Sequence, residues 1–206
     1  HYKASNKTNR ALKKGDLYLV DSGGQYSFGT TDVTRTVSLD NRSGYIKEIY
    51  TRVLKGHIAV SNFKIKKNST GSEVDQNARK YLKRINLDYP HGTGHGVGCF
   101  LNVHEGPQSL SRNNKINLKD GMVVSNEPGY YKEGAFGIRI ENLVYIKKNK
   151  FQELTMAPIE KDLINKKILN SAEIKWINSY HEKVKKSLFK FMDFQEKIDL
   201  KKACSP

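Results

Sequence analysis

One short segment, residues 91–107, constrains this chain more than any other. It contains three histidines and five glycines. His91 and His95 are four residues apart and would share one face of a helix, but each glycine between them would cost a helix about 1 kcal/mol. We therefore expect a loop or an irregular strand, in which the glycines let the backbone approach a bound group closely.

Upstream, two aspartates lie on predicted neighbouring strands. Residues 17–20 form a short apolar, β-prone run that ends at Asp21. Residues 31–37 alternate and are rich in β-branched side chains, which is typical of a second strand, and this strand contains Asp32. A hairpin that joins the two strands would bring Asp21 and Asp32 near each other.

Downstream, two glutamates interrupt apolar β runs. Residues 122–127 are predicted to form a strand that ends at Glu127, before Pro-Gly. Residues 136–146 alternate cleanly and predict one long strand that contains Glu141. The alternation places Arg139 and Glu141 on the same face of that strand.

Together with His95, these four acids form an oxygen-rich donor set. Such a set suits Mn²⁺, or Co²⁺, Fe²⁺ and Zn²⁺ by availability, and argues against a thiolate site. Four carboxylates exceed the need of one divalent ion with open positions, but they match two ions about 3.5–4 Å apart. Each residue alone also has an ordinary structural interpretation, such as a turn or a salt bridge. Spacing alone therefore leaves both interpretations open.

Most of the remaining sequence is predicted to be helical. Residues 43–62 and 171–192 carry apolar side chains at helical spacing, and a further helix is expected to begin with Ser72 as its N-cap. Residues 151–159 are interpreted as a connector, and a lysine-rich tail follows residue 192. The stripe of the last helix includes Trp176, which we expect to be exposed.

The composition limits the classes of protein. The formal net charge of +15 suggests nucleic-acid binding, but the basic residues are scattered and no zinc-finger, RNP or basic-zipper pattern is present, so we regard nucleic acid as an improbable partner. Cys99 and Cys204 are far apart in the sequence and predict neither a disulfide framework nor a thiolate zinc site. This suits a reducing, cytoplasmic location. No apolar run is long enough to span a membrane.

Several long motifs resemble the pita-bread metallopeptidases, a family that includes methionine aminopeptidases, prolidases and aminopeptidase P. The resemblance is strongest to the eukaryotic cytosolic type of aminopeptidase P, or Xaa-Pro aminopeptidase. The motifs that carry it cover residues 21–26, 29–36, 91–107, 125–131 and 137–142. The segment from Leu154 to His181 is similar to the C-terminal extension of that subgroup.

The resemblance implies an α+β pita-bread fold with a helical C-terminal extension. Residues 1–150 would form the catalytic domain, and residues 151–206 would form the extension. Part of the pita-bread domain is expected to precede His1, so we expect the isolated fragment to be inactive. The resemblance also implies a homodimer formed through residues 160–195.

It further implies roles for individual residues. Two divalent ions, with Mn²⁺ preferred and Zn²⁺ or Co²⁺ as alternatives, would be bound by five ligands. His91 would support the site from behind, Arg139 would orient Glu141, and His1 and His104 would contact substrate together with the ligand His95. The five ligands would be Asp21, Asp32, His95, Glu127 and Glu141.

The implied reaction is hydrolysis of the N-terminal Xaa-Pro bond of peptides with proline in second position. A water molecule that bridges two cations loses a proton near neutral pH and becomes a nucleophile. Glu127 would accept that proton and pass it to the leaving nitrogen, while His104 would donate a hydrogen bond to the developing oxyanion. Two alternatives are a prolidase that cleaves Xaa-Pro dipeptides and a non-catalytic pita-bread binding module.

Overall fold

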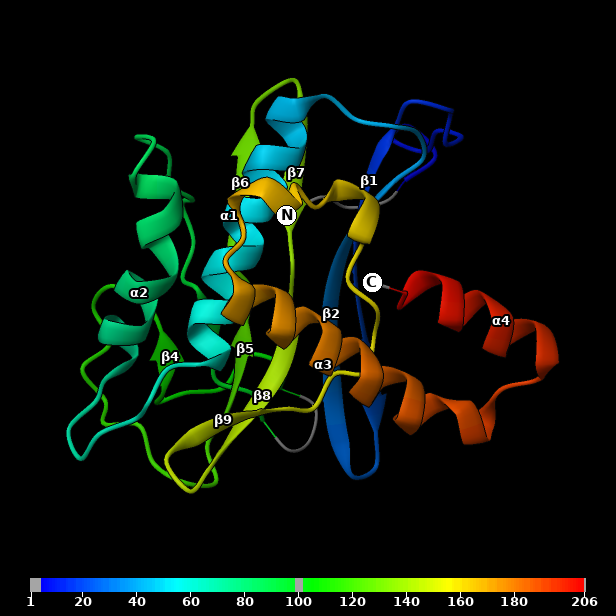
Figure 1. Cartoon of the computed structure of the whole chain (residues 1–206). Helices are drawn as coiled ribbons and strands as arrows, with labels where there is room; N and C mark the ends of the chain where they lie inside the picture. Colours follow the sequence, from blue (N-terminus) through cyan, green and yellow to red (C-terminus); the bar gives the residue numbers. More distant parts are fainter. Residues whose placement is uncertain (1–4, 99–101, 206) are drawn as a thin grey trace.

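A computed structural model of the chain describes residues 5–98 and 102–205. The fold is α+β, as expected, and its sheets are small and antiparallel (Figure 1). The strands are β1 (Leu17–Tyr26), β2 (Gly29–Ser38), β3 (Gly94–His95), β4 (Ser109–Leu110), β5 (Val123–Asn126), β6 (Gly129–Lys132), β7 (Phe136–Arg139), β8 (Asn142–Lys147) and β9 (Lys150–Glu153). The helices are α1 (Gly44–Ser61), α2 (Gly71–Lys83), α3 (Ser171–Leu188) and α4 (Phe194–Ala203).

The predicted hairpin at the start of the chain is confirmed. β1 and β2 pair along their whole length, and both extend beyond the predicted runs to a turn at residues 27–28. Asp21 lies opposite Thr34, and Asp32 lies opposite Gly23. The pairing therefore brings the two aspartates close together, because they lie two steps apart along one ladder.

The single long strand predicted over residues 136–146 is wrong. The chain pairs β7 with β6 in one sheet, and then leaves that sheet to pair β8 with β5 and β9 in another. The break falls at Ile140 and Glu141, directly opposite the break at Glu127 and Pro128 between β5 and β6. Two neighbouring chain segments therefore change sheets together, and each has a glutamate at the change.

Two helix boundaries also differ from expectation. Thr70 rather than Ser72 is the N-cap of α2, because Thr70 and Glu73 form a reciprocal capping box. The last predicted helix ends at Leu188, is followed by a 3₁₀ turn, and gives way to α4, where Asp193 and Glu196 form another capping box. The lysine-rich tail is therefore helical, and the segment interpreted as a connector begins with the strand β9.

The core lies between α1, the strands and α3. Figure 1 shows α3 crossing in front of α1 and the central strands, with α2 beside α1. Buried side chains of α1, β7 and α3 form one apolar cluster, in which Trp176 packs partly buried against the ring of Tyr180 at 5.3 Å between centroids. The expectation that Trp176 is exposed is wrong. The exposed apolar residues of α3 and the segment that follows it are instead Ile174, Phe191, Phe194 and Ile198.

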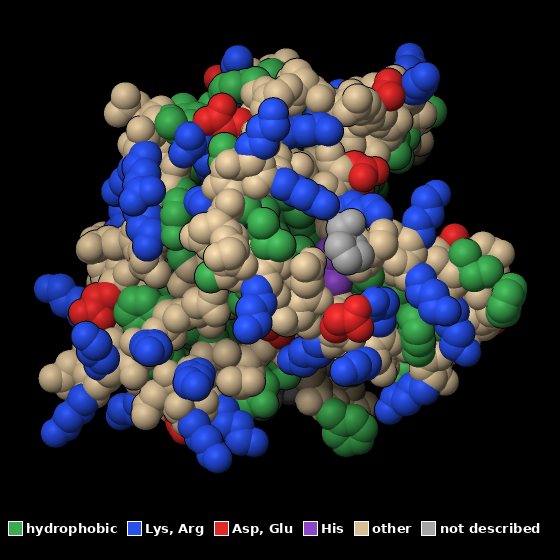
Figure 2. All heavy atoms as spheres, in the orientation of Figure 1, with side chains coloured by type: hydrophobic (Ala, Val, Ile, Leu, Met, Phe, Trp, Pro, Cys, Tyr) green, Lys and Arg blue, Asp and Glu red, His purple; other side chains and the backbone are tan. Residues whose placement is uncertain are grey.

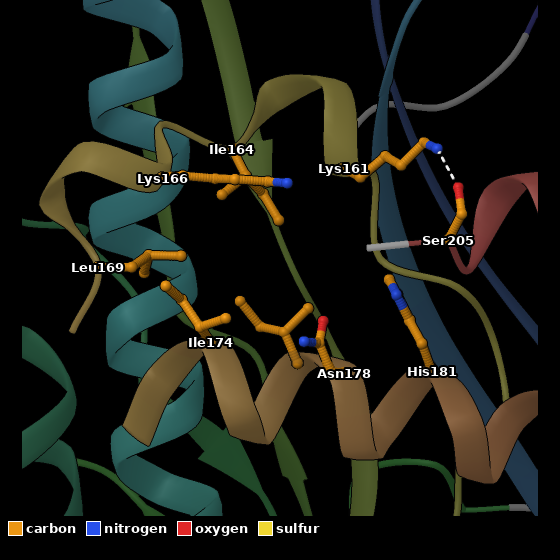
Figure 3. A pocket seen from close by; sticks show the side chains of 9 residues that line it. Lys161, Ile164, Lys166, Leu169, Ile174, Asn178, His181 and Ser205 are labelled. Carbon is orange, nitrogen blue, oxygen red and sulfur yellow. Dashed lines mark hydrogen bonds between the residues drawn. The ribbon is translucent and has the colours of Figure 1, made fainter. Parts of the chain in front are cut away.

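A small apolar cavity of about 70 Å³ lies between α3 and residues 161–169. Figure 3 shows Ile164, Leu169 and Ile174 converging on it, while Lys161 turns toward Ser205. On the molecular surface, Lys and Arg side chains are spread over the visible face rather than gathered in one patch (Figure 2). This distribution supports the interpretation of the charge as a general lysine bias. None of the helices in the described ranges is long and apolar enough to cross a membrane.

Candidate metal centre

The five predicted ligands converge where the hairpin, β3 and the sheet break meet. Within the described residues, three overlapping groups have ligand atoms within 4.8 Å of one another. Two of these groups share Glu141: one joins it to His95 and Glu127, and the other joins it to Asp21 and Asp32. Two sets of donors that share one carboxylate fit two adjacent metal positions.

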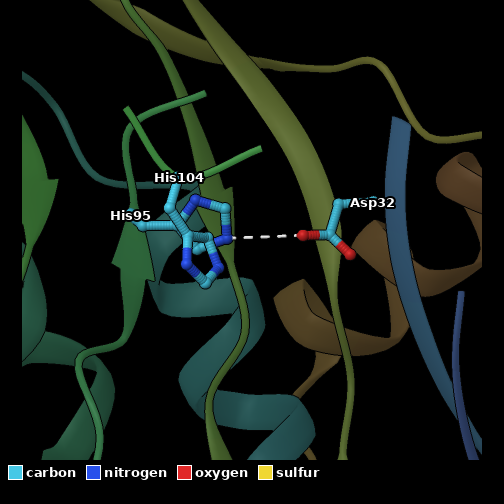
Figure 4. Close-up of side chains that lie close together, drawn as sticks. All are labelled: Asp32, His95 and His104. Atoms are coloured by element: carbon cyan, nitrogen blue, oxygen red, sulfur yellow. Dashed lines mark ion pairs between the residues drawn. The ribbon is translucent and has the colours of Figure 1, made fainter. Parts of the chain in front are cut away.

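His95 is oriented by its own main chain and by β5. Its Nδ1 lies 2.9 Å from the Gly96 carbonyl oxygen, so Nδ1 carries a proton and donates there. Nε2 then faces Asp32 at 3.4 Å (Figure 4). It also lies 3.5 Å from Glu127. The backbone N–H of His95 donates to the Ser125 hydroxyl, which in turn donates to Glu127. This chain of contacts fixes the ring and the carboxylate relative to each other.

Glu141 is the most deeply buried member of the group, with a relative exposure of 2%. The Thr34 hydroxyl donates to its Oε2 at 2.6 Å. Burial, followed by the nearby charges of Glu127 and Asp32, raises the pKa of Glu141 to about 8. Burial likewise raises the pKa of Glu127. These carboxylates crowd one another without enough positive charge, which is the electrostatic condition that divalent cations relieve.

Arg139 is the one guanidinium that reaches into this acidic group in the described part of the chain. It contacts Asp21 at 2.5 Å, the Tyr131 hydroxyl at 2.8 Å and the Thr34 hydroxyl at 3.1 Å. It does not bind Glu141 directly. Its effect on Glu141 passes through Thr34, which accepts from Arg139 and donates to the carboxylate.

His91 does not join the ligand group but is connected to Arg139 through the Tyr131 hydroxyl. Its Nδ1 lies 2.7 Å from the Gly92 carbonyl and must donate to it, so Nε2 accepts the Tyr131 proton at 2.8 Å. Burial lowers the pKa of His91, which is consistent with a neutral ring. Hydrogen bonds thus connect His91, Tyr131 and Arg139 in series to Asp21.

His104 is exposed and faces the open side of the ligand group. Its ring lies 4.0 Å from that of His95, measured between centroids, and Figure 4 shows the two rings against each other. Burial, followed by the charge of His95, lowers the pKa of His104. His1, the other histidine expected to contact substrate, lies outside the described residues.

Gly94 and Gly96 of the 91–107 segment allow a close approach of two backbone segments. A Cβ on Gly94 would lie 1.9 Å from the Ser125 carbonyl oxygen, and one on Gly96 would lie 2.0 Å from that of Glu105. At these two glycines the group that comes close is therefore neighbouring protein backbone. The glycines allow His95 to lie directly against the strand that carries Glu127.

Sequence reasoning missed Thr34, Ser125 and Tyr131 as supporting residues. Thr34 is two residues from Asp32 on β2 and Ser125 is two residues from Glu127, so strand periodicity alone places each pair on one face. Tyr131 could not be found this way, because its contact with His91 spans two elements that meet only in the folded chain.

This fold and this donor set are those expected of a metallopeptidase domain. Residues 1–148 match metallopeptidase family M24, and residues 148–206 match the C-terminal region of peptidase M24. The chain belongs to metallopeptidase family M24.

Within this family, the chain is similar to proteins named aminopeptidase P or Xaa-Pro aminopeptidase. Aminopeptidase P2 of Arabidopsis thaliana is 46% identical over 198 residues, which is 89% of this chain and 28% of that protein. Xaa-Pro aminopeptidase 1 of Dictyostelium discoideum is 46% identical over 197 residues, or 89% of this chain and 31% of that protein. The chain therefore spans less than a third of the length of these two relatives.

Solved structures confirm the predicted pita-bread fold. The X-prolyl aminopeptidase of Caenorhabditis elegans, described as a cytosolic enzyme with a di-nuclear active site, has a TM-score of 0.93 and 38% identity, covering 100% of this chain and 36% of its own. A prolidase from Thermococcus sibiricus has a TM-score of 0.69 and 37% identity, covering 78% of this chain and 42% of its own.

Proposed function

We propose that this chain forms the metal-binding catalytic part of an Xaa-Pro aminopeptidase, which releases the first amino acid from peptides with proline in second position. The observation that carries the proposal is the pair of donor groups that share Glu141. The donors are carboxylates and one imidazole, a set that suits two divalent ions such as Mn²⁺, with Zn²⁺ or Co²⁺ as alternatives. Asp21, Asp32, His95, Glu127 and Glu141 would hold them.

When bound, the two cations would lower the pKa of a water molecule and polarise the substrate carbonyl. The protein's own residues supply proton transfer and orientation. Glu127, whose Oε1 accepts from Ser125, keeps a second oxygen for exchanging a proton with substrate or water. His104, whose ring packs against that of His95, would donate a hydrogen bond to the oxyanion that develops on the substrate carbonyl.

Similarity over the full length of the chain favours the eukaryotic type of aminopeptidase over a prolidase. The worm aminopeptidase covers all of this chain, whereas the prolidase covers 78%. We propose that residues 1–150 form the catalytic domain and residues 151–206 a C-terminal extension. A prolidase is the second candidate because the Thermococcus sibiricus prolidase is 37% identical and covers 78% of this chain.

The test uses the protein expressed from its whole open reading frame, loaded with Mn²⁺. We expect release of arginine from Arg-Pro-Pro, and loss of about 10² to 10⁴-fold in rate for Glu127→Gln, because the proton-transfer group is removed. Glu133→Gln, on an exposed turn, is the matched control. Faster cleavage of Ala-Pro than of Arg-Pro-Pro would favour the prolidase, and a failure to bind metal would favour a non-catalytic binding module.

We also propose a homodimer that uses the C-terminal region. Phe191 and Phe194 are 75% and 80% exposed, and two large apolar side chains this exposed and this close in sequence favour an interaction surface. Light scattering should give twice the mass of one chain, and Phe191→Ser with Phe194→Ser should halve it. A wild-type monomer at high concentration would reject the dimer. By similarity to the worm enzyme, we place the protein in the cytoplasm.

A further inference from the structure

A buried histidine outside the ligand set contacts both chain segments that carry the glutamates. His57 lies on α1 and is fully buried. Its Nδ1 lies 3.1 Å from the Asn126 carbonyl oxygen and 3.3 Å from the Ile140 carbonyl oxygen. Both partners can only accept, so Nδ1 carries the proton and one N–H is shared between two carbonyl groups.

Those two carbonyls occupy a distinctive place in the fold. Asn126 immediately precedes Glu127, and Ile140 immediately precedes Glu141. The β5–β8 ladder ends at the pair Asn126 and Asn142, and the β6–β7 ladder begins at Gly129 and Arg139. The shared N–H therefore bridges the two chain segments at the point where they change sheets, one residue before each glutamate.

Further contacts fix α1 to the same place. The Asn126 side-chain amide donates to the His57 carbonyl at 3.0 Å and to the Ser61 hydroxyl at 3.3 Å. Ser61 donates to Glu153 at 2.6 Å, and the Asn142 amide donates to the other oxygen of Glu153 at 2.7 Å. The strand pair is therefore held from α1 at two successive helical turns, by His57 and by Ser61.

The rest of the imidazole is enclosed by apolar contacts. The Trp176 ring on α3 packs edge-on against it at 5.8 Å between centroids. Nε2 is buried and has no hydrogen-bond partner in the described part of the chain. The histidine thus makes polar contact only toward the glutamate-bearing segments, although leaving Nε2 unpaired in the core has a cost.

We propose that His57 is a positioning residue of the metal centre, whose single N–H sets the separation of Glu127 and Glu141 by holding the carbonyls that precede them. This inference rests on the proposed function, because it takes the two glutamates as metal ligands. A neutral donor is suited to the task, since it ties the segments together without adding charge behind the metal positions. Supporting contacts of this kind typically change metal affinity by 10–100-fold.

The experiment separates the N–H from the bulk of the ring. His57→Asn keeps a donor near the position of Nδ1, whereas His57→Phe keeps a flat ring and His57→Ala removes it, both without a donor. The matched control is His181→Leu, because His181 is also buried on a helix but its Nε2 accepts from the Ile159 N–H and not from a glutamate-bearing segment. Each protein, expressed from its whole open reading frame, is stripped with EDTA. We then measure Mn²⁺ affinity by calorimetry, the visible spectrum with Co²⁺, and the Tm without metal.

We expect His57→Phe and His57→Ala to bind Mn²⁺ at least about tenfold more weakly and to alter the Co²⁺ spectrum. His57→Asn and His181→Leu should stay within about threefold of wild type, even where the Tm falls. Wild-type affinity in His57→Phe would overturn the proposal, as would equal weakening in His57→Asn or His181→Leu. If both donor-free variants fail to fold, His57 serves the fold rather than the site, and the proposal is also overturned.

Cleavage of Arg-Pro-Pro by the wild-type protein is measured in parallel. If the wild type binds Mn²⁺ but cleaves no Xaa-Pro peptide, the proposed activity fails, and the comparison of metal affinities still decides the role of His57.

Discussion

The hydroxyl of Thr34 donates to Glu141 Oε2 at 2.6 Å, although the two residues are 107 positions apart in the sequence. Thr34 lies on the hairpin that carries both aspartates, while Glu141 lies at the sheet break. This hydrogen bond therefore connects the two halves of the candidate metal centre. The same hydroxyl oxygen accepts a hydrogen bond from the Arg139 Nε.

Replacing Thr34 by valine should weaken metal binding. The change removes a hydrogen bond to a buried carboxylate and leaves the Arg139 Nε without that acceptor, and contacts of this kind are worth about 1.5–3 kcal/mol. We expect Mn²⁺ affinity, measured by calorimetry, to fall by about 10-fold or more. Thr30→Val is the control on the same strand, because Thr30 bonds only Gln25 near the hairpin turn. Equal affinities for the two variants would contradict the prediction.

The metal-free protein should become less stable as the pH rises from 6.5 to 8. Burial and the charges of Glu127 and Asp32 raise the pKa of Glu141 to about 8 from its ordinary value of 4.5. Between these values the folded state holds a proton that the unfolded chain has lost, so stability is present below the window and is lost as the pH rises through it. The Tm of EDTA-treated protein should fall, and the Tm gain from Mn²⁺ should grow. Glu141→Gln should flatten the profile, and an unchanged Tm in the wild type would refute this account.

Arg35 should prove essential for stability. Its buried guanidinium donates to the Glu141 carbonyl at 2.6 Å, to Asn142 Oδ1 at 2.7 Å and to the carbonyls of Ala157 and Pro158 at 2.8 Å. Arg35→Met leaves several buried acceptors unpaired at about 1–3 kcal/mol each, so we expect a loss of at least about 3 kcal/mol in denaturant unfolding.

The control for this change is Arg112→Met. Arg112 pairs with Asp88 on the surface, where an ion pair contributes about 0–1 kcal/mol. If both methionine variants lost the same small amount of stability, Arg35 would not link the metal centre to the C-terminal region.

Gly94→Ala should disrupt the site through packing alone. The added Cβ would lie 1.9 Å from the Ser125 carbonyl oxygen, so β3 must move away from β5 and carry His95 with it. We expect a loss of about 3 kcal/mol in stability, at the upper end of overpacking effects, together with weaker metal binding. Gly44→Ala, where nothing lies within 4 Å, should leave both unchanged or gain slightly in stability.

Short-range patterns predicted much of the fold. The helix α1 and the β1–β2 hairpin follow directly from apolar spacing and β-branched alternation, because these elements are decided by neighbours in sequence. The same reasoning failed at residues 136–146. Alternation continues through Ile140 and Glu141, but pairing with different strands on either side breaks the segment in two.

The sequence by itself determined which donors are present and which family the chain resembles, because side-chain chemistry and long motifs are local properties. Only the tertiary structure decided how the donors group around Glu141, and that Gly94 and Gly96 accommodate neighbouring backbone. It also brought in Thr34, Tyr131 and His57, whose contacts join elements distant in sequence. Such contacts leave no periodic pattern in the sequence, because they arise from the packing of elements that are distant along the chain.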